Sequence, residues 1–182
     1  MFIQYDSYKN NESPGPFIPD EYELILGRAI IAFSSLDVQL LVAIASLLTV
    51  DDYEAESIVA EMSFKNRINL FSSLMKLRLS DTEFNFGKHD PKVALSELIS
   101  VCLKAEELRN KLIHSQWDLE PTTQKVRRRK TTSKASSGLK FQYEYAELSE
   151  LNRIVNYILY ATTCIGDVFN HFTDFKVRNR TA

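Results

Sequence analysis

With 182 residues, 45% of them hydrophobic, the chain holds enough apolar material for one domain that folds alone. Two isolated cysteines exclude a disulfide framework, so we expect a reducing, cytoplasmic location. The net charge of −2 conceals an asymmetry, because residues 1–63 carry two basic and eleven acidic side chains, whereas the remainder carries 20 basic and 13 acidic ones. The basic part predicts a surface for a polyanion.

Residues 1–19 predict a loose N-terminal arm, because they are polar, contain three prolines and show no secretory signal pattern. The longest apolar run, Val38–Val50, is interrupted by three polar residues and is shorter than the roughly 20 residues that cross a bilayer. We therefore interpret this run as part of a buried helix and expect no membrane contact.

Apolar residues at intervals of three and four predict a long first helix over residues 21–48. Asp51 and Glu54 form a capping-box pattern that opens a short second helix, and Ser63 is placed to cap a third. A loop composition follows over residues 80–90.

The fourth helix is predicted to begin near Pro91, a residue favoured in the first helical turn, and to end before Ser115. Ser149 is placed to cap the last helix, which precedes a basic tail at 177–182. These helices carry apolar stripes that we expect to form the core: Leu26, Ala29, Ile30, Phe33, Leu36, Leu40, Ala43, Ile44 and Leu47 in the first, Phe64, Ile68, Phe71 and Met75 in the third, Ala94, Leu98, Val101, Ala105, Leu108 and Leu112 in the fourth, and Leu151, Ile154, Val155, Ile158, Ala161, Ile165, Val168, Phe169 and Phe172 in the last.

Together these patterns predict an all-α fold, an antiparallel helical bundle of four to five helices over residues 20–176. Residues 118–146 interrupt the helical periodicity and are expected to form a basic loop or a short β-hairpin. The hairpin would pair residues 124–131 with 140–145, where apolar and polar residues alternate.

The inserted segment carries a run of cations that follows the fourth helix closely. We predict RNA contact, because phosphate neutralisation by basic side chains is what sequence-independent RNA binding requires, and the residues concerned are Lys125, Arg127, Arg128, Arg129 and Lys130. The alternative is a solvated loop without a ligand.

The end of the fourth helix combines a guanidinium, an amide and an imidazole in Arg109, Asn110 and His114. These groups can grip a phosphate and move protons around it at neutral pH. At about 100° per residue Asn110 and His114 stack one turn apart, whereas Arg109 and His114 diverge by about 140°. One copy is therefore a poor clamp, and a two-fold axis beside this helix would supply a second pair. The alternative is that Arg109 and Asn110 are solvated and His114 satisfies the helix carbonyls.

The segment Arg109-Asn110-Lys111-Leu112-Ile113-His114 resembles the R-N-x-x-x-H signature of HEPN domains, all-helical modules common in prokaryotic toxins and defence systems. The resemblance covers the motif and the helical layout of residues 20–175. It implies metal-independent RNA cleavage by a homodimer with a composite active site, and an antitoxin or other regulatory protein as a further partner. Gln116 stands where some such toxins carry a modifiable Tyr, so nucleotidylation there is not expected.

The sequence contains no zinc-protease, paired-cysteine or calcium-loop motif and no glycine-rich phosphate loop, so we expect neither a metal nor another cofactor. Our hypothesis is cleavage of RNA by attack of the ribose 2′-OH, with His114 as general base or acid, Arg109 stabilising charge and Asn110 orienting. Two alternatives remain open: a catalytically silent module that binds RNA or nucleotide, and a purely structural interaction domain.

Overall fold

The computed structural model describes residues 18–48, 50–80, 90–134 and 138–180. The predicted arm, apart from its last two residues, and most of the predicted 80–90 loop lie outside the described residues. The described chain is mostly helical, with five helices and one small antiparallel sheet: α1 (Asp20–Leu48), α2 (Asp52–Val59), α3 (Phe64–Ser80), α4 (Pro91–Ile113), β1 (Gln116–Leu119), β2 (Val126–Lys134), β3 (Gly138–Tyr145) and α5 (Leu148–Arg180).

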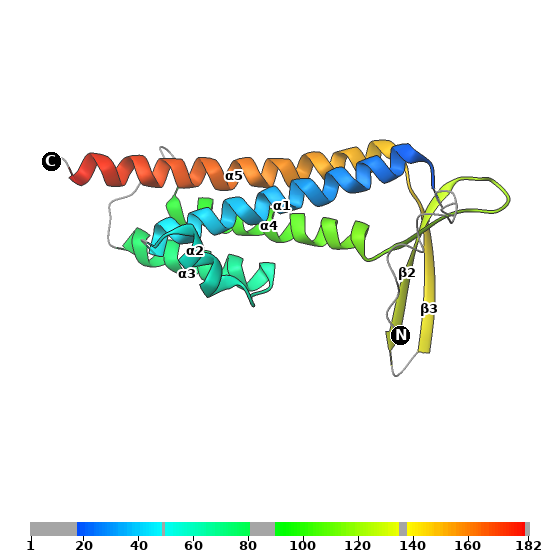
Figure 1. The fold of residues 1–182 in the computed structure, drawn as a ribbon, viewed down its shortest axis with the longest axis horizontal. Coiled ribbons are helices and arrows are strands. Elements are labelled where there is room, and N and C mark those ends of the chain that lie inside the picture. Colours follow the sequence, from blue (N-terminus) through cyan, green and yellow to red (C-terminus); the bar gives the residue numbers. More distant parts are fainter. Residues whose placement is uncertain (1–17, 49, 81–89, 135–137, 181–182) are drawn as a thin grey trace, which may run out of the picture.

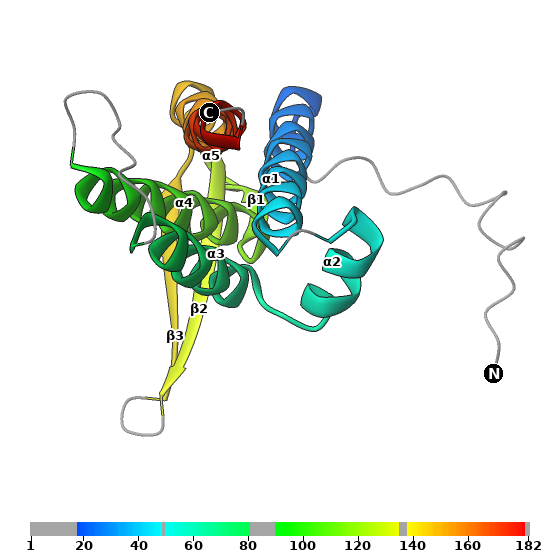
Figure 2. The ribbon, with the colours of Figure 1, turned by 90° about the vertical axis from the view of Figure 1, so that its left-hand side faces the viewer.

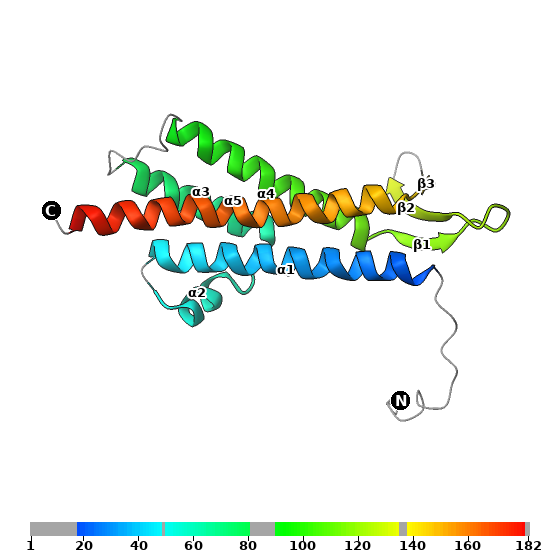
Figure 3. The same ribbon diagram turned by 90° about the horizontal axis from the view of Figure 1, so that it is seen from above.

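The two longest helices, α1 and α5, pack side by side along the length of the molecule (Figures 1 and 3). They run parallel, because the Tyr22 hydroxyl near the start of α1 donates to the Ala146 carbonyl just before α5, at 3.0 Å. Further along, a Cβ on Gly166 of α5 would lie 3.8 Å from Gln39 of α1. Helix α4 runs the opposite way, since Lys111 near its end pairs with Glu150 near the start of α5, at 3.5 Å. The predicted antiparallel arrangement therefore applies to α4 and α5 and is wrong for α1 and α5.

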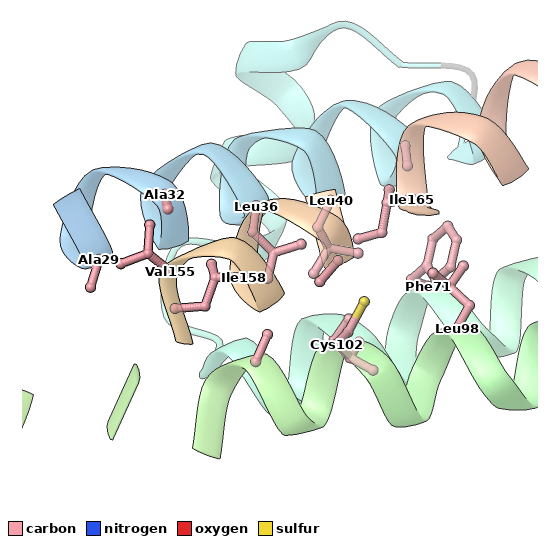
Figure 4. Close-up of a cluster of buried hydrophobic side chains, with 14 of the residues drawn as sticks. Ala29, Ala32, Leu36, Leu40, Phe71, Leu98, Cys102, Val155, Ile158 and Ile165 are labelled. Carbon is pink, nitrogen blue, oxygen red and sulfur yellow. The ribbon is translucent and has the colours of Figure 1, made fainter. Parts of the chain in front are cut away.

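Seen along its length, the molecule has α4 and α3 packed beneath the α1–α5 pair, with α2 against α1 (Figure 2). Buried side chains from α1, α3, α4 and α5 meet in the space between these helices (Figure 4). Most of the predicted stripes lie there, but Ile30 is 48% exposed, and Ile25 occupies the core instead. The side chain of Phe172, also predicted for the core, lies outside the described residues. In α4 the buried residues include Cys102, a small core residue as its apolar surroundings in the sequence indicate, and Leu95, which the predicted stripe omits.

Local signals account for several helix starts. Before α2, the Glu54 amide donates to the Asp51 carboxylate at 2.8 Å and the Glu54 carboxylate accepts from the Asp51 amide, so the predicted capping box is confirmed. Ser63 caps α3 through the Asn66 amide, and α4 begins at Pro91 as predicted. Helix α5 begins at Leu148, so the predicted cap at Ser149 is wrong, and it extends to Arg180, into the predicted tail.

The inserted segment forms a three-stranded antiparallel sheet in the order β1-β2-β3 at the end of the molecule where α1 and α5 begin (Figure 1). The predicted hairpin is confirmed, with Arg127 opposite Tyr145 and Thr131 opposite Phe141. Strand β1 was not predicted, so the all-α class needs this correction. A small cluster of Ile18, Val126 and Ala146 anchors the base of the sheet, and Trp117 packs against both this cluster and the main core.

By length and composition α1 could also cross a membrane, since an 18-residue window in it has a mean hydropathy of 2.0. In this fold 39% of that window is buried, against α2, α3, α4 and α5. The absence of membrane contact stays a prediction.

Candidate functional site

The candidate site lies where α4 ends and the sheet begins. His114 is the C-cap of α4, its side chain is exposed, and its amide donates to the Asn110 carbonyl at 3.1 Å. The next two carbonyls of the last turn accept from other side chains, Lys111 from the Ser115 hydroxyl at 2.7 Å and Leu112 from the Trp117 indole at 2.9 Å. The last turn is thus satisfied by donors other than the imidazole, which remains available for another task.

Asn110 and His114 line an open cleft of about 670 Å³ between the end of α4 and one face of the sheet. We call this face of the sheet the inner face. The far wall of the cleft consists of side chains from β2 and β3, including Lys130, which is exposed. The complete lining is Glu107, Asn110, Lys111, His114, Ser115, Arg128, Lys130, Thr131, Gln142 and Glu144.

Arg109 is not part of this lining. Its guanidinium lies over the Phe33 ring of α1, with Cζ 5.2 Å from the ring centroid, and Nη1 donates to Asn110 Oδ1 at 2.9 Å. Phe33 in turn packs on Phe64 of α3, with the ring centroids 4.8 Å apart. The structure therefore brings Asn110 and His114 together in one chain, and connects Arg109 to them only through the amide of Asn110.

Arg128, predicted to contact RNA, is buried with 7% of its surface exposed. Its guanidinium donates to the Lys111 carbonyl at 3.2 Å and to the Glu144 carboxylate, so it ties the sheet to the end of α4. The hydrogen bond from this guanidinium is the main cause that lowers the pKa of the Glu144 carboxyl, and the positive charges of Lys111 and Lys130 lower the pKa further. Because Arg128 is engaged inside the protein, we remove it from the set of phosphate contacts.

The other predicted cations divide between the two faces of the sheet, because successive side chains of a strand point to opposite sides. Lys130 lies on the inner face, whereas Arg127 and Arg129 lie on the outer face, and Lys125 precedes β2 on that same side. Arg127 Nε donates to the Asp118 carboxylate at 2.6 Å, which raises the pKa of the guanidinium. Arg129 donates to the side-chain oxygen of Gln116.

The sequence prediction missed the aromatic residues of β3. The outer face carries Phe141, Tyr143 and Tyr145, each about half exposed. Lys125 lies over Tyr145 at 5.9 Å, Arg127 over Tyr143 at 4.5 Å and Arg129 over Phe141 at 5.1 Å from the ring centroid. The alternation of residues 141–145 was the available signal, but it was used only to predict a strand.

Within the described parts of the chain, no group of three or more His, Cys, Asp or Glu side chains is placed to hold a metal ion. No family model, curated protein or solved structure matches the chain.

Proposed function

We propose that this protein is a metal-independent endoribonuclease of the HEPN type that acts as a toxin or defence effector. The observation that carries the proposal is the cleft in which Asn110 and the exposed His114 face the inner face of the sheet with its exposed cation Lys130. An imidazole at the edge of an open cleft, with an exposed Lys130 across from it, is suited to a phosphodiester substrate. The helices α1, α3, α4 and α5 would form the bundle that presents this cleft.

In the proposed reaction a general base removes the proton of a ribose 2′-OH, and the oxygen forms a bond to the adjacent phosphorus. The bond from phosphorus to the 5′ oxygen breaks, and that oxygen accepts a proton from a general acid. The products are a 2′,3′-cyclic phosphate and a 5′-hydroxyl end. His114 acts as the general base or the general acid, Asn110 positions the substrate or the imidazole, and Lys130 neutralises a phosphate.

Arg109 stabilises charge on the phosphoryl oxygens in this proposal, but within one chain it is held against Phe33 and away from the cleft lining. A homodimer offers a solution, since a two-fold axis beside α4 would bring a second Arg109 to the cleft. Without a second chain, Arg109 would act only by orienting the Asn110 amide.

The test is incubation of wild type and His114→Ala with end-labelled RNA in EDTA. We expect wild type to cut and the variant to lose at least about a hundredfold in rate, because general acid–base help is worth roughly that much or more. Since His114 is exposed, the helical circular dichroism and melting temperature should not change. Lys65→Ala, an exposed cation on α3, is the control for lost positive charge. Full activity of His114→Ala contradicts the proposal, and so does a loss of wild-type activity when EDTA is added.

A second RNA tests the nucleophile. A 2′-deoxy substitution at the scissile nucleotide removes the attacking hydroxyl, so this substrate should resist cutting while its affinity stays close to that of the parent RNA. Normal cutting at the substituted position would exclude attack by the 2′-OH.

The second candidate is a catalytically silent RNA-binding module. The position of Arg109 against α1 and the aromatic outer face of the sheet favour it, because both are compatible with binding and neither requires cleavage. A silent module would retard labelled RNA in a gel and leave it at full length.

A further inference from the structure

The outer face of the sheet has a regular composition that the cleft does not explain. The register places Arg127 directly opposite Tyr145 and Arg129 directly opposite Tyr143, so these four side chains point to the same side. Phe141 continues the row on β3, and Lys125 begins it before β2. We define the outer platform as Lys125, Arg127, Arg129, Phe141, Tyr143 and Tyr145.

Each cation of the outer platform lies over the ring that is diagonal to it on the neighbouring strand. The three distances, 5.9, 4.5 and 5.1 Å, fall in the range of cation–π contacts. The result is a ladder of alternating cations and rings that extends from Phe141 to Tyr145 along β3. Successive rings are about 7 Å apart along β3, because each residue advances a strand by about 3.3 Å.

The three rings of the outer platform remain half exposed beside the described parts of the chain. Phe141, Tyr143 and Tyr145 are 51%, 48% and 56% exposed, although each already has a cation against it. Strands β2 and β3 extend away from the helices (Figures 1 and 2). Three neighbouring half-exposed aromatics form an apolar surface that is rarely left exposed without a binding role.

The chemistry of the platform selects a ligand with flat apolar faces and regular negative charge. Single-stranded nucleic acid has both, because every base offers a face for stacking and every nucleotide carries a phosphate. Two carboxylates, Asp118 and Glu120, act on Arg127, and Asp118 pairs with it directly. Three cations with one directly paired carboxylate leave the platform net positive. An acidic peptide would meet the charge but has no partner for the rings.

We propose that the outer platform binds single-stranded RNA, with bases stacked on Phe141, Tyr143 and Tyr145 and phosphates held by Lys125, Arg127 and Arg129. This inference rests on the proposed function for the identity of the ligand as RNA, and it does not depend on cleavage. Strand β3 is an edge strand whose Gln142 and Glu144 line the cleft on the other face. An RNA strand that passes over this edge contacts the platform and then reaches His114.

The test is fluorescence anisotropy with a 5′-labelled oligonucleotide, in a His114→Ala background so that the RNA stays whole. We expect Tyr143→Ala to weaken binding about tenfold or more, as base stacking on aromatic residues generally contributes. Tyr143→Phe keeps the ring and should bind like the background protein. Tyr53→Ala is the matched control, because Tyr53 is 83% exposed on α2, away from the sheet. Equal binding by Tyr143→Ala and Tyr53→Ala overturns the proposal.

Tyr143→Leu is a second variant that controls for misfolding, because leucine retains apolar bulk in the strand but cannot stack on a base. We expect it to weaken binding as Tyr143→Ala does while Trp117 fluorescence stays unchanged; wild-type affinity for this variant overturns the platform.

Arg127→Ala should lower the slope of log affinity against log salt by about one. A duplex of the same sequence should bind much more weakly, and polyglutamate should not compete. Competition by polyglutamate as effective as by RNA would mean a merely charged surface and would overturn the platform.

These outcomes separate the two proposals. If His114→Ala still cuts RNA and the Tyr143 variants lose affinity, the catalytic proposal fails and the platform stands. If His114→Ala is inactive and the Tyr143 variants bind normally, the platform fails and the catalytic proposal stands. Absence of any RNA binding by the His114→Ala protein overturns the platform.

Discussion

The buried guanidinium of Arg128 joins the Glu144 carboxylate of the neighbouring strand to the last turn of α4. It donates to Glu144 and, at 3.2 Å, to the Lys111 carbonyl, and Lys111 itself lies within 3.9 Å of Glu144. The sequence alone predicts that Arg128 contacts RNA. In the structure this residue instead links the sheet to the helix that carries the candidate site.

Removal of this link should loosen the sheet. We expect Arg128→Met, which retains apolar volume and loses the donors, to lower the free energy of unfolding by about 2 kcal/mol, because the Glu144 carboxylate and the Lys111 carbonyl each lose a hydrogen bond from the guanidinium. The loss is no larger because the Glu144 side chain is 41% exposed and its charge is screened by solvent. Urea unfolding followed by Trp117 fluorescence measures the change. Lys130→Met, an exposed neighbour on the same strand face, should have no effect larger than about 0.5 kcal/mol.

The same pair predicts a dependence on acid. Arg128 lowers the pKa of Glu144 in the folded protein, so the folded state holds this proton less tightly than the unfolded state. The stabilisation is therefore present above the unfolded pKa of about 4.3 and is lost as the pH falls through the lower folded value. Urea midpoints measured from pH 6 down to pH 3 should fall more steeply for wild type than for Glu144→Gln. Glu56→Gln, on α2, should follow the wild-type profile, and a Glu144→Gln profile as steep as wild type would contradict the assignment.

The position of Arg109 predicts how mixed dimers behave. If Arg109 serves the cleft of the partner subunit, co-expressed Arg109→Ala and His114→Ala chains should regain activity, because one of the two sites in each mixed dimer then has both residues. Random pairing predicts recovery to about a quarter of wild type. If Arg109 acts only through Asn110 in its own chain, at 2.9 Å, every site lacks one residue and no activity returns. RNA cleavage by the purified mixture, compared with each variant alone, distinguishes these outcomes.

Cys102 should be inert in the folded protein. Burial, with a smaller contribution from Cys164, raises the pKa of its thiol to about 12, so at pH 8 only about one molecule in 10,000 carries the reactive thiolate. In Cys164→Ala we expect no reaction with a thiol reagent until urea unfolds the chain. Because the folded pKa lies above the unfolded value of about 8.5, the stability of this region should also decline as the pH rises from about 8.5. Rapid native labelling of Cys164→Ala would contradict the burial of Cys102.

Several features that depend on a few neighbouring residues were predicted correctly, although the cap at Ser149 was not. The capping box at Asp51, the cap at Ser63 and the start of α4 at Pro91 were recognised because each involves groups within three residues of one another. The pairing of β2 with β3 was also recognised from the alternating residues of the segment 140–145. Strand β1 was missed, since four residues carry little periodicity and its pairing with β2 depends on a partner about ten residues away.

For the candidate site too, relationships between nearby residues were predicted and those between distant residues were not. By itself the sequence determined which groups are close along the chain, so Asn110 and His114 were expected one turn apart, and both line the cleft. Only the tertiary structure decided that Arg128 is buried against Glu144, that Arg109 lies over Phe33, and that three aromatic residues share a face with three cations. The physical reason is that a side chain's charge and shape are local properties, whereas its burial and its partners depend on elements that meet only after folding.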